Sequence, residues 1–189
     1  MITIRSEHAR DIKAREALLD DVFGIERHAK TCERLREGRL PVRGLSFISE
    51  DDGCLIGTVR LWHVEAGTAG ASLILGPLAV AKANRSSGVG ARLMRTALRR
   101  AAMLGHRSIL LVGDVSYYER FGFSANLTQR LCLPGPVDPK RFLGLELETG
   151  ALFDAIGQVF ATGVLNSNHS DVVLHQSASH RSRLMNLAA

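Results

Sequence analysis

The stretch LGPLAVAKANRSSGVGA, residues 75–91, is the most informative part of this 189-residue chain. An apolar run ends at Val80, a short polar loop follows, and a helix is expected to begin at the GVG turn of residues 88–90. Backbone N–H groups at a helix N-terminus lack intrahelical partners, and the helix dipole adds positive potential there. The two glycines of the turn leave room for a phosphate, and Arg85 can add a charge-assisted contact. The segment therefore predicts an anion-binding site.

Two other phosphate-binding fingerprints are excluded by the residues around this turn. No Gly-Lys-Ser/Thr follows it, as a P-loop would require. Leu93 occupies the position of the third glycine in the dinucleotide-binding pattern, and the upstream pattern also differs. A Gly-x-Gly turn alone says little, so its meaning depends on the rest of the chain.

The apolar pattern on either side of the turn predicts a mixed α/β (α+β) protein rather than a regular βαβ alternation. Residues 71–80 are almost wholly apolar, which is typical of a strand covered on both faces and hence central in its sheet. Other strands are expected at residues 2–5, 45–50, 54–64, 108–112, 126–133, 141–148 and 157–163, and helices at 9–23, 26–37, 88–104 and 115–121.

The composition is that of an ordinary globular protein with a basic surface. The net charge is +5, which suits a phosphorylated ligand as well as a nucleic acid. The three cysteines are far apart, so reduced, half-buried thiols are expected, with no disulfide framework and no metal site. No apolar run reaches 18 residues and the first residues contain no signal-peptide core, so we expect a cytoplasmic protein with no membrane contact.

The chain is expected to hold one domain and a tail. Residues 1–163 carry the periodic segments described above. Residues 164–189 are rich in Ser, Asn and His and lack a sustained period, which favours a loosely attached C-terminal tail with a short helix near its end.

Two motifs at a suitable separation resemble those of the GNAT acetyltransferases. RSSGVGA at residues 85–91 resembles the R/Q-x-x-G-x-G/A signature of that family and follows a strand that ends in LAV. About thirty residues later, YERFGF at residues 118–123 resembles the Y-x-x-x-G-F element. The phrases LGPLAV, GDVSYYERFGF and PGPVDPKRFLGLEL are similar to those of the YhbS-like subgroup of predicted acetyltransferases. The resemblance extends over roughly residues 2 to 163.

The resemblance implies a mostly antiparallel central sheet, flanked by helices, in which two parallel strands splay apart to form a cleft. Residues 71–80 and 108–112 would be these two strands, and acetyl-CoA or another acyl-CoA would be the co-substrate. Its pantetheine would pair with the backbone of Leu78 and Val80, and its pyrophosphate would lie on the N–H groups of residues 85–91. The implied cofactor-binding residues are Leu78, Ala79, Val80, Arg85, Ser86, Ser87, Gly88, Val89, Gly90, Ala91 and Tyr118.

The implied reaction is direct acyl transfer to a primary amine, without a covalent acyl-enzyme. Tyr118 matches the general acid that protonates the departing thiolate; the alternative is a packed helix tyrosine, which is the role expected for Tyr117. The strand at 71–80 contains no acid that could act as the base. Asp114 is the catalytic substitute, unless it only caps the following helix. Weaker candidates for the base are Glu50, Glu65 and His63.

The acceptor is a small-molecule or protein amine that the sequence does not identify. Arg27, Lys30 and Arg34 could bind an anionic acceptor, or they could form a solvated helix face. A catalytically silent acyl-CoA-binding module is the alternative function. Nucleic acid is not an expected partner, because no binding motif is present and aromatic residues make up only 5% of the chain. A homodimer is the default expectation from the resemblance.

Overall fold

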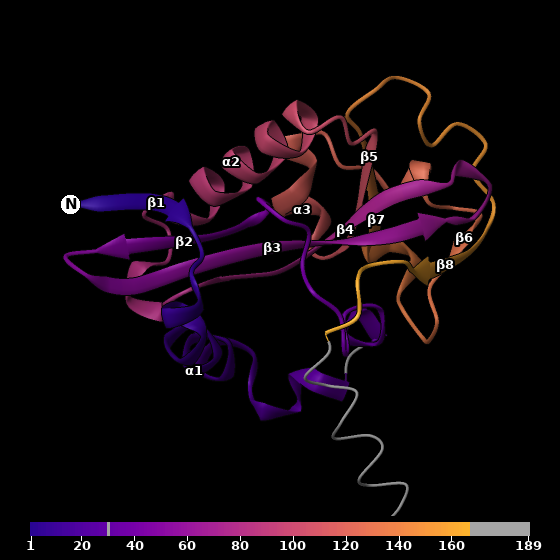
Figure 1. The fold of residues 1–189 in the computed structure, drawn as a ribbon. Coiled ribbons are helices and arrows are strands. Elements are labelled where there is room, and N and C mark those ends of the chain that lie inside the picture. Colours follow the sequence, from indigo (N-terminus) through magenta and orange to yellow (C-terminus); the bar gives the residue numbers. More distant parts are fainter. Residues whose placement is uncertain (30, 167–189) are drawn as a thin grey trace, which may run out of the picture.

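The computed structural model describes residues 1–29 and 31–166, and these form one eight-stranded mixed sheet with helices on both faces (Figure 1). The strand order is β1-β2-β3-β4-β5-β7, with β8 paired to β3 and β6. Among the strands of these residues only the β4–β5 and β6–β8 pairs are parallel, which confirms the mostly antiparallel sheet. The strands are β1 Ile2–Ser6, β2 Ser46–Asp51, β3 Cys54–Ala66, β4 Ala71–Val80, β5 Ser108–Val112, β6 Leu131–Cys132, β7 Phe142–Glu146 and β8 Gly157–Ala161.

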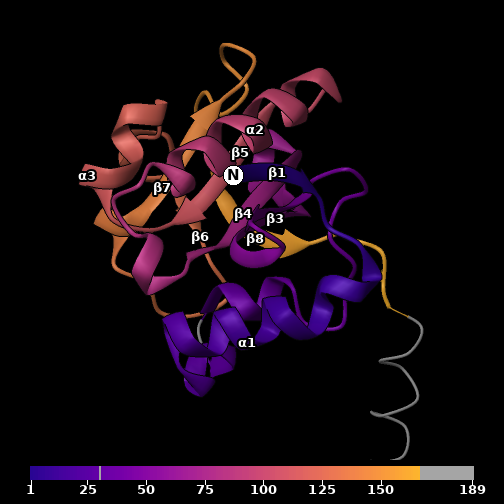
Figure 2. The ribbon, with the colours of Figure 1, turned by 90° about the vertical axis from the view of Figure 1, so that its left-hand side faces the viewer.

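Two α-helices cover the two faces of the sheet. In both views α1 (Ile12–Phe23) lies on one face and α2 (Val89–Met103) on the other (Figures 1 and 2). The predicted four-residue apolar period of α2 is confirmed, because its members are all buried against the sheet: Val89, Leu93, Ala97 and Ala101. A short third helix, α3 (Val115–Tyr118), follows β5 and continues as the 3₁₀ turn η6 (Glu119–Phe121).

The predicted helix at residues 26–37 is wrong. The described residues there form two short 3₁₀ segments, η2 (Ile25–Ala29) and η3 (Thr31–Leu35). An isolated helix of this length is marginal, so tertiary contacts decide its conformation. Those contacts fasten the segment to a distant loop, because Thr31 Oγ1 donates to the Pro136 carbonyl at 2.7 Å and Arg34 Nη1 to the Pro134 carbonyl at 2.8 Å.

Several other boundaries also differ from the predictions. The expected strand at 126–133 contains only β6, because Ser124 caps a 3₁₀ turn, η7 (Ala125–Leu127), that precedes it. The first predicted helix opens with another 3₁₀ turn, η1 (Ala9–Asp11), before α1. The remaining 3₁₀ turns are η4 (Gly67–Ala69), η5 (Lys82–Asn84) and η8 (Pro139–Arg141).

Strand β4 is central, as its apolar sequence predicts, but it is paired on both edges over only part of its length. Its parallel pairing with β5 is limited to Leu73–Ile109 and Ile74–Leu110. Beyond these pairs β4 continues to Val80 beside β3 alone. The two parallel strands therefore separate, which confirms the splayed pair.

A buried group of charges attaches α1 to the sheet. Glu7 accepts a hydrogen bond from Arg15 and forms an ion pair with Arg60 Nε at 3.1 Å. Burial lowers the pKa of Arg60 to about 10. Arg27, just beyond α1, is held by Glu16 and by Asp20. These pairs fix the position of the wall that α1 and η2 contribute to the cleft.

The last described residues return to the body of the protein. Leu40 N donates to the Val164 carbonyl and Asn166 N to the Gly38 carbonyl, both at 2.8 Å. The described chain is therefore paired three residues beyond the proposed domain boundary at 163. The expected tail helix lies in residues 167–189, outside the described residues. Within the described part of the chain, no helix is long and apolar enough to cross a bilayer.

Candidate active site

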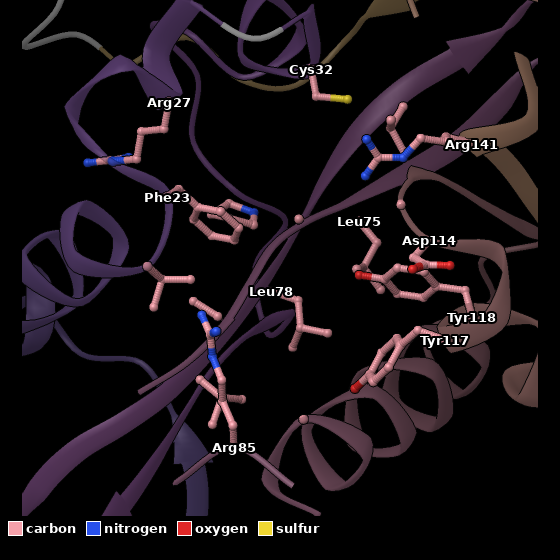
Figure 3. Close-up of a pocket in the computed structure, with 18 of the residues that line it drawn as sticks. Phe23, Arg27, Cys32, Leu75, Leu78, Arg85, Asp114, Tyr117, Tyr118 and Arg141 are labelled. Atoms are coloured by element: carbon pink, nitrogen blue, oxygen red, sulfur yellow. The ribbon is translucent and has the colours of Figure 1, made fainter. Parts of the chain in front are cut away.

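The separation of β4 from β5 opens a cavity of about 1140 Å³. Its walls come from the end of β4, the start of α2, the segment from α1 to η3, and the loop before β7. In Figure 3 the labelled side chains extend from Arg85 at one end to Cys32 at the other, with Tyr118 between them. We call the Arg85 side the donor end and the Cys32 side the acceptor end, after the two substrates that the sequence led us to expect.

The unpaired edge of β4 supplies backbone groups to this cavity. Ala81 N donates to the Ile56 carbonyl of β3. Because backbone groups alternate between the two edges of a strand, Ala79 also faces β3, whereas Leu78 and Val80 present their N–H and C=O groups to the free edge. Upstream, the register with β3 shifts between Val59 and Leu61, at the bulge formed by residues 76–77.

The donor end closes on the N-terminus of α2. Gly88 is the N-cap residue and has φ +83°, a left-handed conformation that favours glycine. Ser86 also has a positive φ, and Ser87 Oγ fastens the loop by donating to the Asn84 carbonyl at 2.6 Å. No atom lies within 4 Å of the position that a Cβ on Gly88 would take. Residues 88–91 line the cavity, so the unpaired N–H groups at the start of α2 lie beside open space that can admit an anion.

The two tyrosines of α3 point into different parts of the cavity (Figure 3). Tyr118 packs its ring over the backbone of Gly113. Burial raises the pKa of Tyr118 to about 12, so the phenol stays protonated at neutral pH. Tyr117, expected to be only structural, places its hydroxyl over Gly90, where an added Cβ would lie 2.6 Å from it. This contact could not be predicted from the sequence, because it joins α3 to α2.

Asp114 lines the cavity and also caps α3. Its Oδ1 accepts from Ser116 N at 3.0 Å and from Ser116 Oγ at 2.9 Å. Both bonds use the same oxygen, so Oδ2 has no hydrogen-bond partner among the described residues. Of the weaker base candidates, Glu50 instead pairs with Arg5 and His63 contacts His106, and neither lines the cavity; Glu65 is also outside it.

The acceptor end contains several arginines, but they are not the same set as the three basic residues that the sequence suggested for binding an acceptor. Arg27 lines the cavity, Arg34 points to the loop at Pro134, and Lys30 lies outside the described residues. Arg36 and Arg141 also line it and were not predicted. Arg36 lies outside the motifs, and Arg141 lies in the phrase PGPVDPKRFLGLEL, which carries the resemblance but does not indicate which way this side chain points.

The cysteines are free thiols, but only Cys32 is half-buried; Cys54 and Cys132 are exposed. Cys32 lines the cavity, and burial raises the pKa of its thiol, which makes it a poor nucleophile at neutral pH. Within residues 1–29 and 31–166 no group of three or more His, Cys, Asp or Glu side chains is placed to bind a metal ion.

Comparison with known proteins gives consistent sequence matches. The family model for the acetyltransferase (GNAT) domain matches residues 43–125. The chain is 30% identical over 125 residues to the uncharacterized N-acetyltransferase YjhQ of Escherichia coli K12, covering 65% of this chain and 67% of that protein. It is 31% identical over 121 residues to the uncharacterized N-acetyltransferase YhbS of the same strain, covering 64% and 72%.

Solved structures agree with these matches. YhbS from Escherichia coli, in complex with CoA, has a TM-score of 0.72 and 28% identity, covering 85% of this chain and 89% of that one. A GNAT family acetyltransferase from Brucella melitensis, in complex with acetyl-CoA, has a TM-score of 0.59 and 25% identity, covering 88% and 97%.

The splayed parallel strands and the glycine-bearing start of α2 are those of an acyltransferase fold. The chain belongs to the GNAT family of acetyltransferases, and it is an N-acetyltransferase.

Proposed function

We propose that this protein transfers an acetyl group from acetyl-CoA to a primary amine by direct attack within a ternary complex. One observation carries the proposal: the free edge of β4 leads into the open N-terminus of α2 along a single cavity. The CoA and acetyl-CoA present in the two related structures support the choice of donor.

The residues at the donor end fit this substrate. Leu78 and Val80 offer free backbone groups with which an extended pantetheine pairs as an additional strand. The N–H groups from Gly88 to Ala91 receive the pyrophosphate, and the space above Gly88 admits it. Arg85 lines the cavity and has no ion-pair partner among the described residues, so its guanidinium is available to a phosphate.

The chemistry needs one proton acceptor and one proton donor. The amine nitrogen attacks the thioester carbon, the C–S bond breaks, and the electron pair leaves on sulfur. Tyr118 donates its proton to that thiolate. Burial raises the pKa of this phenol, but it raises the pKa of a thiol in the same place for the same reason, so the transfer stays feasible. Asp114 Oδ2 accepts the amine proton, directly or through water.

The proposal is tested first by calorimetric titration and then by removing the phenol. Acetyl-CoA should bind with micromolar affinity and ATP much more weakly. In Tyr118→Phe, kcat should fall by about 100-fold, because a general acid contributes about 10²–10⁴ to the rate, while acetyl-CoA affinity is retained. Turnover is measured as thiol release with a panel of amines.

Tyr117→Phe is the comparison variant, since it removes the neighbouring hydroxyl from the same short helix and should leave kcat nearly unchanged. A folded protein that binds neither CoA species contradicts the proposal. If acetyl-CoA binds but Tyr118→Phe leaves turnover unchanged, Tyr118 is not the acid. Binding without turnover of any amine would favour a silent acyl-CoA-binding module.

A further inference from the structure

Arg141 differs from the other arginines at the acceptor end in having no partner. Arg27 is held by Glu16 and Asp20. Arg36 donates to the Cys32 carbonyl at 3.1 Å and contacts Glu33 at 3.3 Å. The Arg141 side chain forms no hydrogen bond or ion pair with any described residue, although it lines the cavity.

The backbone of Arg141 is nevertheless held firmly in place. Its N–H donates to the Asp138 carbonyl and its C=O accepts from Gly113 N, both at 2.9 Å. Gly113 directly precedes Asp114, so Arg141 is fixed beside the proposed base. The nearby Asp138 side chain caps η8 by accepting from Lys140 N at 3.0 Å, and it forms no ion pair with the Arg141 guanidinium. The loop therefore presents, at a defined point, a guanidinium that has no ion-pair partner among the described residues.

This guanidinium lies near the reacting groups. In Figure 3 Arg141 is on the same wall as Tyr118 and extends into the cavity. Its charge opposes the rise that burial causes in the pKa of Tyr118, which is consistent with their proximity. A group bound to Arg141 would thus sit beside the amine that is being acetylated, not beside the phosphates at the Arg85 end.

A second cation faces the same space from another wall. Arg36 is largely buried, and this burial lowers the pKa of its guanidinium. Its Nη1 atom has no hydrogen-bond partner among the described residues and lies next to Gly76 of the β4 bulge, 3.4 Å from where a Cβ would be. Glu33 pairs with the other end of this guanidinium, so Arg141 contributes the unpaired charge and Arg36 a free N–H donor. Together they disfavour a polycationic acceptor and favour one with an anionic group.

We infer that the acceptor is an amine that also carries a carboxylate, as a free amino acid does, and that Arg141 binds this carboxylate. A guanidinium can form two parallel hydrogen bonds to a carboxylate, which orients the substrate as well as attracting it. The bound carboxylate then positions the amine between Asp114 and the thioester. This inference rests on the proposed function and adds the chemical class of the acceptor.

The test uses matched acceptors with acetyl-CoA as donor. Each free amino acid of a panel is compared with its own amide, and spermidine is included as a polycation. The amide has the more readily deprotonated amine, so intrinsic reactivity opposes the expected preference. We expect kcat/KM to be at least about tenfold higher for the best free amino acid than for its amide, given the strength of a bidentate ion pair.

Arg141→Gln should lower kcat/KM for the amino acid by about 10- to 100-fold, mainly through KM. The value for the amide should fall much less, because only the effect of the charge on Tyr118 is lost there. Arg141→Lys should recover part of the loss, because it keeps the positive charge but cannot form two parallel hydrogen bonds to a carboxylate. Lys140→Gln is the charge-matched control from the same loop, and it should behave as the unaltered protein. Acetyl-CoA affinity should be unchanged in all three variants.

Three results would overturn the inference. One is a kcat/KM for an amide or for spermidine that equals the value for the best free amino acid. Another is an equal loss of kcat/KM for an amino acid and its amide in Arg141→Gln. The third is a protein that binds acetyl-CoA but neither acetylates any amino acid of the panel nor is thermally stabilised by one in the presence of CoA. Failure of the unaltered protein to bind acetyl-CoA is a different result, because it refutes the proposed function itself.

Discussion

The two ends of the cavity are built in different ways. The donor end is made mainly of backbone groups from one continuous segment, from Leu78 on β4 to Ala91 on α2. The acceptor end is made of side chains from separate segments, with Arg36 after η3 and Arg141 at the end of η8. A backbone site leaves a local signature of glycines and strand length in the sequence. A site made of side chains from distant segments leaves no such signature.

The largest expected effect is at the donor end. Gly88→Val should weaken acetyl-CoA binding by about 10³-fold, because it removes access to at least two N–H groups whose charged hydrogen bonds contribute roughly 2 kcal/mol each. Calorimetry measures the change in Kd, and thermal unfolding shows that the variant is folded.

Gly53→Val is its matched control. Gly53 has φ +81°, no atom near its Cβ position, and a place in the β2–β3 hairpin away from the cavity. Both variants should lose a similar roughly 1–2 kcal/mol of stability from backbone strain, and only the first should lose binding. Normal binding by Gly88→Val would place the donor phosphates elsewhere.

A smaller effect is expected between the two ends, at Asp114. Asp114→Asn removes the proton acceptor but keeps an amide oxygen that caps α3 equally well, so stability should not change. We expect kcat to fall by about 10- to 100-fold near neutral pH, measured as thiol release. The deficit should shrink as the pH rises, because more of the amine is then neutral without help. Full activity at every pH would leave Asp114 with the capping role alone.

The smallest effect tests whether the donor end is independent of distant side chains. In Gly90→Ala the new Cβ would lie 2.6 Å from the Tyr117 hydroxyl, which must then move. In the Tyr117→Phe background the nearest remaining contacts are ordinary, at 3.5 Å to Val80 Cγ2 and 3.8 Å to the ring. Denaturant unfolding of the four proteins should therefore give a coupling free energy of about 1 kcal/mol. Additive effects would mean that α3 does not support the glycine turn.

Long elements with a clear period could be predicted from the sequence. The apolar run of β4 indicated a central strand, and the four-residue repeat of α2 indicated its buried face. The predicted helix at residues 26–37 was wrong because a short polar helix has little stability of its own. The hydrogen bonds from Thr31 and Arg34 to the loop at residues 134–136 decided the conformation of this segment instead. The predicted strand at residues 126–133 was largely wrong for a similar reason, since a serine-capped turn replaced most of it.

The sequence by itself determined the family and the glycine turn at which we propose the donor site, because both depend on residues that are adjacent in the chain. Only the tertiary structure decided which charges reach the acceptor end. Arg36 and Arg141 are separated by about a hundred residues of chain, yet both line one cavity. Tyr117 and Gly90 also lie on separate elements, α3 and α2, and the fold brings them into contact. Which side chains share a cavity depends on how separate segments pack together, and that packing is a property of the whole fold.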